Sequence, residues 1–356
     1  MQTVRVGFVG GGEHARMSLL PSLRHAFGGA PTGLPSLVSS HAGESLSPLQ
    51  GRLVALAEHK RPHAERIAAF HGIGEIYTNH REMLENAALD CAIVCLHPRL
   101  QVDAAIDCLD AGLHVFVEKP PAETLKEGLR LREAAQRNNK NVGVAFMKRF
   151  SLPYLRARAI TQLPQFGQPS MYEARFTYGQ YPVEVYNFLN GFGIHHLDLP
   201  RYFMGAIETV QAERVSRGAG LDGYAITLRF ANGGLGLVNI NCLESTYTNW
   251  SERLSISGVG SSVFVENWRR VIAYVAGEEG PRYWEPEDIQ PTDDANNLHL
   301  HGFVGEIRDF VASVAENRKP AADLEDGIAA LRLQEAIEGS VESGTRIALA
   351  EVHPDV

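Results

Sequence analysis

The sequence predicts an α/β protein of two domains, in which a doubly wound parallel sheet precedes an α+β domain with an open, mostly antiparallel sheet. The length of 356 residues exceeds what one hydrophobic core usually holds. A glycine-rich turn joins an apolar strand to a helix near the N-terminus, and after Phe150 short strands alternating with helices give way to longer alternating apolar runs. We expect domains at 1–147 and 148–335, with a C-terminal helix and strand at 336–356 packing back on the body.

The glycine-rich turn is the first candidate binding feature. A strand over 4–9 leads into Gly10-Gly11-Gly12-Glu13-His14-Ala15 and then into a helix. This is the context of a dinucleotide-binding fingerprint, because glycines let the backbone approach a pyrophosphate and a helix N-terminus offers it N–H groups. A turn that merely reverses the chain is the competing interpretation. The next strand, 53–57, favours nucleotide binding because it ends at Glu58, whose carboxylate would accept hydrogen bonds from ribose hydroxyls.

The spacing between the turn and this acidic residue needs an explanation. Glu58 lies 46 positions after Gly12, whereas the fingerprint expects about 20. Residues 28–51 are 24 residues rich in Gly, Pro and Ser, without periodicity. We interpret them as a surface insertion, which leaves an ordinary spacing of 22.

Regular alternation through the rest of the first domain indicates a parallel sheet. We expect helices at 62–71, 80–87, 102–111 and 125–138, and strands at 76–77, 91–96, 114–117 and 142–146. Cofactors bind at the carboxyl ends of such strands. The turns Leu96-His97-Pro98 and Glu118-Lys119-Pro120 each follow a strand and therefore belong on the binding rim.

The tripeptide Glu118-Lys119-Pro120 needs an unusual backbone if it is functional. Neighbouring side chains on a strand point to opposite faces, so Glu118 and Lys119 share a pocket only if the chain is distorted. A proline can supply the distortion, and we predict a cis peptide bond between Lys119 and Pro120. The alternative is a solvated lysine at a strand end, with the prolines starting a helix.

The second domain should form an open sheet. We expect strands at 171–178, 210–215, 224–230, 235–242, 254–257, 263–266 and 271–275, with hairpin turns at 232–234 and 258–260. Helices would cover one face, and self-association would cover the other, consistent with the apolar Leu235, Leu237 and Ile240. We therefore expect a homodimer or homotetramer through this sheet.

Composition excludes several classes of partner. The net charge is -9 and the pI about 5.9, with no stripe of Lys or Arg, so nucleic acid is not expected. Four cysteines follow neither a zinc spacing nor a secreted disulfide pattern. No apolar run approaches the ~20 residues of a membrane span, and a strand stands where a signal peptide would lie. These features indicate a cytoplasmic protein that does not interact with membranes.

A histidine motif completes the set of candidate residues. In Gly193-x-His195-x-x-Asp198, the histidine and the aspartate lie three apart and share a helix face. The glycine turn, Glu58, Leu96-His97-Pro98, Glu118-Lys119-Pro120 and this motif stand in the order typical of the glucose-fructose oxidoreductase, inositol dehydrogenase and MocA family. The chain resembles that family over nearly its whole length. The resemblance implies a Rossmann domain and an NAD(P)-dependent oxidoreductase that transfers a hydride between nicotinamide and a sugar-like, cyclitol or related hydroxyl substrate.

The resemblance also implies residue roles. Lys119 would bind the reacting hydroxyl and His195 would take its proton, a contribution that suits a positioned histidine. Gln101 stands where the family usually has a histidine. The remaining roles are pyrophosphate contacts from Gly10, Gly12, Glu13 and His14, a ribose contact from Glu58, a nicotinamide side formed by His97, Pro98, Gln101 and Glu118, and substrate contacts from Arg149, Asn190, His196 and Asp198.

Some alternatives stay open at this point. Glu58 favours NAD because it repels a 2'-phosphate, whereas the following His59-Lys60-Arg61 would accommodate NADP. Arg149 is equally compatible with an interdomain ion pair. The histidine motif could be read as metal ligands, but polar residues at a helix start are favoured and we expect no metal.

One position departs from the family pattern. Many members carry an aspartate four residues before the histidine, where this chain has Gly191. Asn190 or His196 would then have to orient His195. The departure keeps two alternatives to the dehydrogenase: a cofactor-binding sensor without turnover, and an NAD-retaining glycoside-cleaving enzyme.

Overall fold

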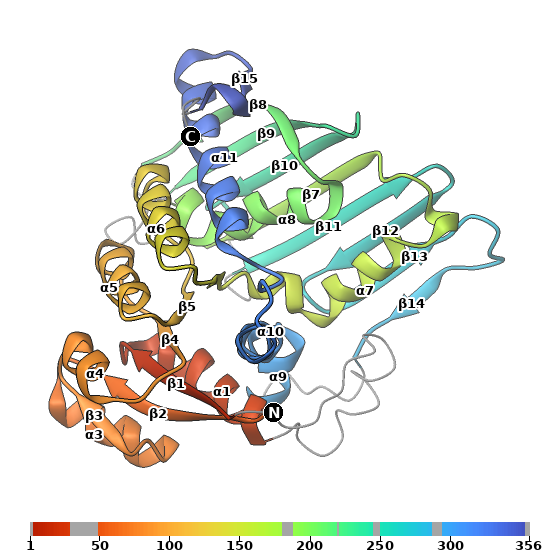
Figure 1. The fold of residues 1–356 in the computed structure, drawn as a ribbon. Helices are drawn as coiled ribbons and strands as arrows, with labels where there is room; N and C mark the ends of the chain where they lie inside the picture. Colours follow the sequence, from red (N-terminus) through yellow and green to blue (C-terminus); the bar gives the residue numbers. More distant parts are fainter. Residues whose placement is uncertain are drawn as a thin grey trace. The chain divides into compact units, whose positions relative to one another are not determined.

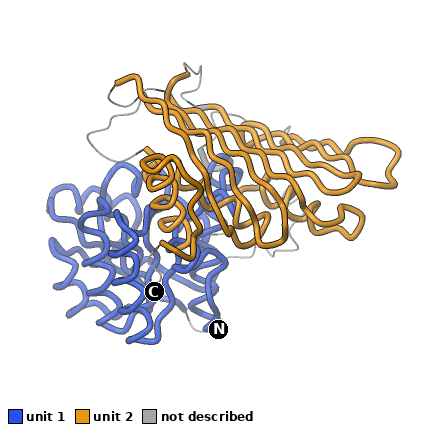
Figure 2. The backbone as a smooth tube through the Cα atoms, turned by 90° about the horizontal axis from the view of Figure 1, so that it is seen from above, with its two compact units in different colours: residues 1–150, 290–328 blue, residues 151–289, 329–356 orange. Residues whose placement is uncertain are grey.

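The computed structural model describes residues 3–28, 49–179, 188–218, 221–244, 250–286 and 294–352. The chain divides into two compact units, shown in two colours in Figure 2. Unit 1 comprises Met1–Phe150 and Gln290–Ile328, and unit 2 comprises Ser151–Ile289 and Ala329–Val356. The predicted insertion at 28–51 falls almost entirely outside the described residues.

Unit 1 contains a parallel sheet whose described strands follow the order β3-β2-β1-β4-β5-β6, which confirms the doubly wound fold (Figure 1). The strand order changes direction beside β1, which pairs with β2 on one side and β4 on the other. A ligand crevice is expected at such a switch point. The strands are β1 (Val4–Val9), β2 (Gly51–Ala57), β3 (Glu75–Tyr77), β4 (Cys91–Val94), β5 (His114–Val117) and β6 (Val142–Val144).

Three of the four helices expected at 62–138 begin within one residue of the expected position, whereas α5 begins at Pro98, four residues earlier than expected. The side chain of Asn79 accepts a hydrogen bond from the Arg81 N–H, and that of Thr124 accepts one from the Glu127 N–H, so both residues act as N-caps. Pro98 is the first residue of its helix, where a missing N–H costs nothing. The elements are η1 (Ala15–Leu19), α1 (Leu20–Gly28), α3 (Arg61–His71), α4 (His80–Asn86), α5 (Pro98–Asp110), α6 (Leu125–Arg137) and η2 (Met147–Phe150).

A later segment of the chain completes unit 1, which the sequence-based division did not anticipate. Helices α9 (Asp294–Leu300) and α10 (Phe303–Glu316) follow the strands of unit 2 in sequence. Ile307, Phe310 and Val311 nevertheless belong to the core that surrounds β1. The Phe310 ring lies 5.4 Å from that of Phe116 on β5. The predicted second domain at 148–335 therefore contains residues that fold with the first.

Unit 2 contains a sheet whose described strands follow the order β14-β13-β12-β11-β7-β10-β9-β8-β15. Among the described strands of this sheet, only the pairing of β10 with β7 is parallel, so the mostly antiparallel prediction is confirmed. Both predicted hairpins are present, joining β9 to β10 and β11 to β12. The strands are β7 (Met171–Tyr178), β8 (Ile207–Ser216), β9 (Asp222–Phe230), β10 (Leu235–Asn241), β11 (Trp250–Gly258), β12 (Ser261–Glu266), β13 (Arg270–Tyr274), β14 (Arg282–Trp284) and β15 (Ile347–Ala348).

Helices cover one face of this sheet and leave the other open (Figure 1). The covering helices include α7 (Leu152–Thr161) and α8 (Ile194–Met204), while α11 (Leu324–Ser343) reaches β8 through a hydrogen bond from the Ala212 N–H to Ser340 Oγ of 3.0 Å. Along β10 exposure alternates, and Leu235 and Leu237 lie on the open face. The expectation that Ile240 joins them is wrong: it is fully buried on the helix side, because strand side chains alternate between faces.

Within the described part of the chain, no helix combines the length and apolar character needed to cross a lipid bilayer.

Candidate active site

The glycine turn after β1 is held between two neighbouring strands. The Gly10 N–H donates to the Ala57 carbonyl at 2.9 Å. Gly10 has φ +101°, and a Cβ at this position would lie 2.2 Å from the Cys95 carbonyl oxygen, so no larger residue fits. At Gly12, by contrast, no described atom lies within 4 Å of where a Cβ would stand. Contacts with Ala57 and Cys95 thus fix the start of the turn, while the space beside Gly12 stays open, as a pyrophosphate would require.

Glu58 links the end of β2 to this turn. One carboxylate oxygen accepts a hydrogen bond from the Gly11 N–H at 2.9 Å, and the other accepts one from the Lys60 N–H at 3.1 Å. The side chain is almost completely buried. His59 Nδ1 also lies 3.0 Å from one of these carboxylate oxygens. A carboxylate has about four acceptor positions, so Glu58 retains capacity for a ribose hydroxyl while it holds the turn.

The end of β5 brings Glu118 to the same rim. The Lys119–Pro120 peptide bond is cis, as predicted. One Glu118 carboxylate oxygen lies 2.8 Å from His14 Nε2, and the other accepts a hydrogen bond from the Lys119 N–H at 2.9 Å. Lys119 itself is half-buried. The glycine turn, the end of β2 and the end of β5 are therefore joined through side chains that the sequence had grouped.

Glu118 stays ionised in this position. Burial alone would raise its pKa, but His14 and Lys119 outweigh that effect and lower the pKa below its usual value. A buried carboxylate that keeps its charge provides a fixed acceptor for its neighbours.

Gln101 has a supporting role that the sequence did not reveal. Its side chain is fully buried on α5. The amide nitrogen donates to the carbonyl oxygens of Glu118 at 2.5 Å and Pro120 at 2.9 Å. Gln101 thus positions the turn that carries Lys119. The nearby His97 caps α5, with Nδ1 accepting from the Arg99 N–H at 3.4 Å.

The histidine motif lies in unit 2, at the start of α8. Asn190 belongs to the π-helical turn η4 (Leu189–Gly193) that leads into this helix, and Asn190, His195, His196 and Asp198 are all buried. His196 Nε2 lies 3.3 Å from a carboxylate oxygen of Glu252, and its ring stacks on Phe176 with centroids 4.6 Å apart. A carboxylate therefore binds the histidine pair at His196, although position 191 carries none.

Arg149 forms the ion pair that one interpretation expected, but within a single unit. Its guanidinium lies 2.9 Å from Asp326 and donates to the Ala321 carbonyl at 3.2 Å. Asp326 belongs to the returning segment of unit 1, so the expected interdomain pair is wrong. The side chain is nearly inaccessible, which favours a structural role over a substrate contact.

Two buried acids escaped the sequence analysis, and each left a weak signal. Glu252 lies two residues before Leu254 and four before Ile256 on β11, so its side chain is on the same buried face. It accepts a hydrogen bond from the Tyr154 hydroxyl on α7. Glu306 lies three and four residues from Phe303 and Phe310 on α10, an acid among apolar neighbours.

No three His, Cys, Asp or Glu side chains gather around a possible metal position among the residues that the structure describes.

Comparison with known proteins agrees with this geometry. The model of an oxidoreductase family with an NAD-binding Rossmann fold matches residues 4–146, and that of the family's C-terminal α/β domain matches 164–349. Myo-inositol 2-dehydrogenase of Thermotoga maritima is 25% identical over 302 residues, covering 79% of this chain and 86% of that protein. The NAD⁺-dependent scyllo-inositol 2-dehydrogenase of Bacillus subtilis is 25% identical over 324 residues, covering 86% and 94%.

A solved structure shows the same fold across both units. Levoglucosan dehydrogenase in complex with NADH superposes with a TM-score of 0.80, covering 98% of this chain and 99% of that one at 19% identity. The matched family domains span the parallel sheet with its glycine turn and the open sheet with its histidine motif. The chain belongs to the glucose-fructose oxidoreductase, inositol dehydrogenase and MocA family and is an NAD-dependent oxidoreductase that acts on CH–OH groups.

Proposed function

We propose that this oxidoreductase interconverts a secondary alcohol of a cyclitol or sugar and the corresponding ketone. The observation that carries the proposal is the rim of unit 1, where Glu58 binds the glycine turn and Glu118 binds His14 beside Lys119. The curated relatives named above act on inositols, and the levoglucosan enzyme on an anhydrosugar. A substrate rich in hydroxyl groups is supported by both.

The proposed roles follow from the chemistry of each group. Lys119 binds the reacting hydroxyl and stabilises the charge that develops on its oxygen. His195 takes the hydroxyl proton, since a sugar hydroxyl is too weak an acid to ionise alone. The bound nicotinamide accepts the hydride. Asn190 and Asp198 remain candidates for substrate hydroxyls, and Gly12, Glu13, His14, His97 and Pro98 for cofactor contacts.

His196 is proposed as a support for His195 and not as a substrate contact. Its ring is completely buried, stacked on Phe176 and bound to Glu252. A fixed His196 restrains the first turn of α8. The side chain of the preceding residue, His195, projects from the same turn. Glu252 would thereby supply the carboxylate that Gly191 lacks.

The first experiment titrates the protein with NADH and NADPH by fluorescence and then screens NAD⁺ reduction with inositols, aldoses and sugar acids. We expect tight NADH binding and turnover of at least one polyol. Lys119→Ala should lower kcat/KM by about 10²- to 10³-fold, the loss typical of one stabilising donor. Lys126→Ala, which changes an exposed lysine on α6, is the matched control and should leave turnover unchanged.

Other outcomes of this screen identify the alternatives. Binding of NADH without reduction of NAD⁺ by any alcohol would favour the sensor. Cofactor that stays bound through purification, with glycoside cleavage and no net NADH, would favour the redox-assisted hydrolase. Tighter binding of NADPH than NADH would show that Lys60 and Arg61 outweigh Glu58.

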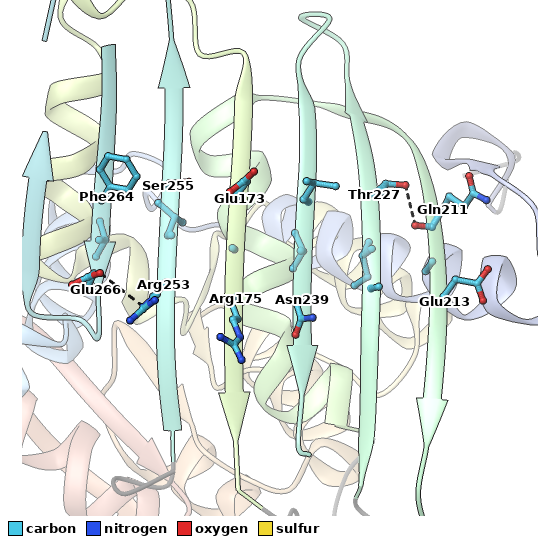
Figure 3. A pocket seen from close by; sticks show the side chains of 18 of the residues that line it. Glu173, Arg175, Gln211, Glu213, Thr227, Asn239, Arg253, Ser255, Phe264 and Glu266 are labelled. Carbon is cyan, nitrogen blue, oxygen red and sulfur yellow. Dashed lines mark hydrogen bonds and ion pairs between the residues drawn. The ribbon is translucent and has the colours of Figure 1, made fainter. Parts of the chain in front are cut away.

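We further propose that two copies associate through the open face of the sheet in unit 2, as a homodimer or as half of a homotetramer. Figure 3 looks onto this face, which carries a shallow hollow of about 910 Å³. Acidic and basic side chains alternate across it, so the same face on a second copy is electrostatically complementary. The charged lining residues are Glu173, Glu213, Glu266, Arg175, Arg253 and Arg346.

We also propose a cytoplasmic location. The described cysteines, Cys91, Cys95, Cys108 and Cys242, are all in the free thiol form. Unpaired thiols are typical of a reducing compartment.

A further inference from the structure

Glu306 is a buried ionisable side chain that the proposed mechanism does not use. It lies in the first turn of α10 with 1% of its surface exposed. Neither carboxyl oxygen has a hydrogen-bond partner among the described residues. Burying a carboxyl group without a partner is costly, so the position calls for an explanation.

The start of α10 lies against the rim of the candidate site. The Phe303 ring contacts that of His14 with centroids 5.8 Å apart, and His14 binds Glu118. Gly305 lies against Phe150 of η2, where an added Cβ would come within 2.8 Å of the Phe150 Cβ. Helix α10 therefore brings Glu306 to the end of β5, although nearly two hundred residues separate them in sequence.

Charges at the end of β5 act directly on Glu306. Burial raises its pKa well above the usual value, Glu118 raises it further, and Lys119 opposes both. The pKa values of these two carboxyl groups thus shift in opposite directions, that of Glu118 below and that of Glu306 well above the usual value. Such divergent pairs are characteristic of sites that move protons.

Other charged groups near α10 are already engaged or act less directly. Arg5 pairs with Asp90, Arg149 with Asp326, and Arg318 with Asp309 of α10 itself. The titratable groups with described side chains on the elements packed against α10 are Arg5 on β1, Arg16 on η1, Arg24 and His25 on α1, His114 on β5, Lys148 and Arg149 on η2, and His299 on α9. Among the described residues, only Glu118 and Lys119 contribute charge effects at Glu306.

We propose that Glu306 is a further residue of the cofactor site, a carboxylic acid that releases its proton when the positively charged oxidised cofactor binds and keeps it when the neutral-ringed reduced cofactor binds. The inference rests on the proposed role of Lys119. The charge of Lys119 already lowers the pKa of Glu306, and a nicotinamide ring bound beside Lys119 would act on Glu306 in the same way. A nearby cation favours the ionised form of an acid. The released proton goes to solvent, and no bond other than the carboxyl O–H breaks.

The test measures protons and not turnover. Calorimetric titrations with NAD⁺ and with NADH at pH 7, each in two buffers of different ionisation enthalpy, give the number of protons released on binding. We expect a substantial fraction of one proton for NAD⁺ and none for NADH. Glu306→Gln, which keeps the shape and the neutral form, should bind both cofactors with no proton release. Glu316→Gln, on the exposed end of the same helix, is the matched control and should match the wild type.

Affinity provides a second readout that needs no variant. Between pH 6 and pH 9, the wild-type affinity for NAD⁺ relative to NADH should rise by up to about tenfold per pH unit below the pKa of Glu306 in the free protein. Equal proton release in Glu306→Gln and wild type, or a ratio independent of pH, would overturn the inference alone. A protein that binds neither cofactor would overturn the proposed function as well.

Discussion

At the level of single side chains, the acids of this protein show how context sets charge. Glu118 lies between His14 and Lys119 and keeps its charge despite burial. Glu306 is influenced by Lys119 and by Glu118 itself, has no hydrogen-bond partner among the described residues, and burial dominates its pKa. Two identical side chains at one rim are therefore suited to different tasks, a fixed acceptor and a proton carrier.

Glu252 allows a prediction about stability. Its carboxylate is bound by the Tyr154 hydroxyl and by His196, all three groups being buried. Glu252→Ala leaves both partners unsatisfied and should lower the free energy of unfolding by about 3 to 5 kcal/mol. Glu252→Gln preserves an acceptor and should cost less. Urea unfolding followed by circular dichroism measures both changes.

The matched control for this prediction lies on the same sheet. Glu173 occupies the opposite, open face of β7, and Glu173→Ala should change the free energy of unfolding by less than about 0.5 kcal/mol. Equal effects at the two positions would contradict a special role for Glu252. If Glu252→Gln folds normally but raises KM or lowers kcat, the support that it gives to His195 through His196 is confirmed.

Sequence reasoning found the residues whose type and order carry information. Glu58, Glu118 and Lys119 follow strands at recognisable positions, and the structure brings the first two to the glycine turn. Glu252 and Glu306 were missed, and so was the contact of Gln101 with the Glu118 carbonyl, because these features depend on partners 17 to 98 residues away or on the docking of a helix distant in sequence. Local pattern does not encode such partners.

Among the elements, strand β10 shows how the two faces of one strand differ in their surroundings. Its inward side chains, including Val238 and Ile240, are buried under helices, while Leu235 and Leu237 lie exposed on the open face. The period of two was visible in the sequence, but the length of the strand did not reveal which alternate set faces inward. That choice follows from the register of β10 with β7 and β9.

This face provides a prediction about assembly. Leu237→Arg places a charge in the middle of the proposed interface, while its register partner Glu173 can pair with the new guanidinium and preserve the monomer. Light scattering coupled to gel filtration should show the wild type at two or four times 39.0 kDa and the variant at half the wild-type mass. Phe70→Arg, which changes an exposed aromatic on α3 of unit 1, should leave the mass unchanged. A monomeric wild type would contradict the proposal.

At the scale of the whole molecule, the division into two units predicts where a cofactor stabilises the chain. NADH at one hundred times its dissociation constant should stabilise the state that binds it by about 2.7 kcal/mol. Hydrogen exchange followed by mass spectrometry should then show protection in β1, β4 and α10 of unit 1. Strands β9 and β10 of unit 2 serve as internal controls. Uniform protection would indicate that the two units unfold together.

The fold class was predictable at this scale, whereas the path of the chain was not. Alternating strands and helices up to 146 indicated the parallel sheet, and longer alternating runs indicated the open one. The return of 290–328 to unit 1 was hidden, because an amphipathic helix such as α10 carries no mark of the core that it covers.

This returning segment has a consequence for the gene. A fragment that stops at residue 150 would leave Phe116 and Gly143 without the Phe310 ring that packs on them. Because α11 begins in unit 1 and ends in unit 2, no single cut separates two intact modules. Recombination that replaces everything after residue 150 would therefore also replace Glu306 and part of the core of unit 1. Viable chimaeras need crossovers at the three places where the chain passes from one unit to the other.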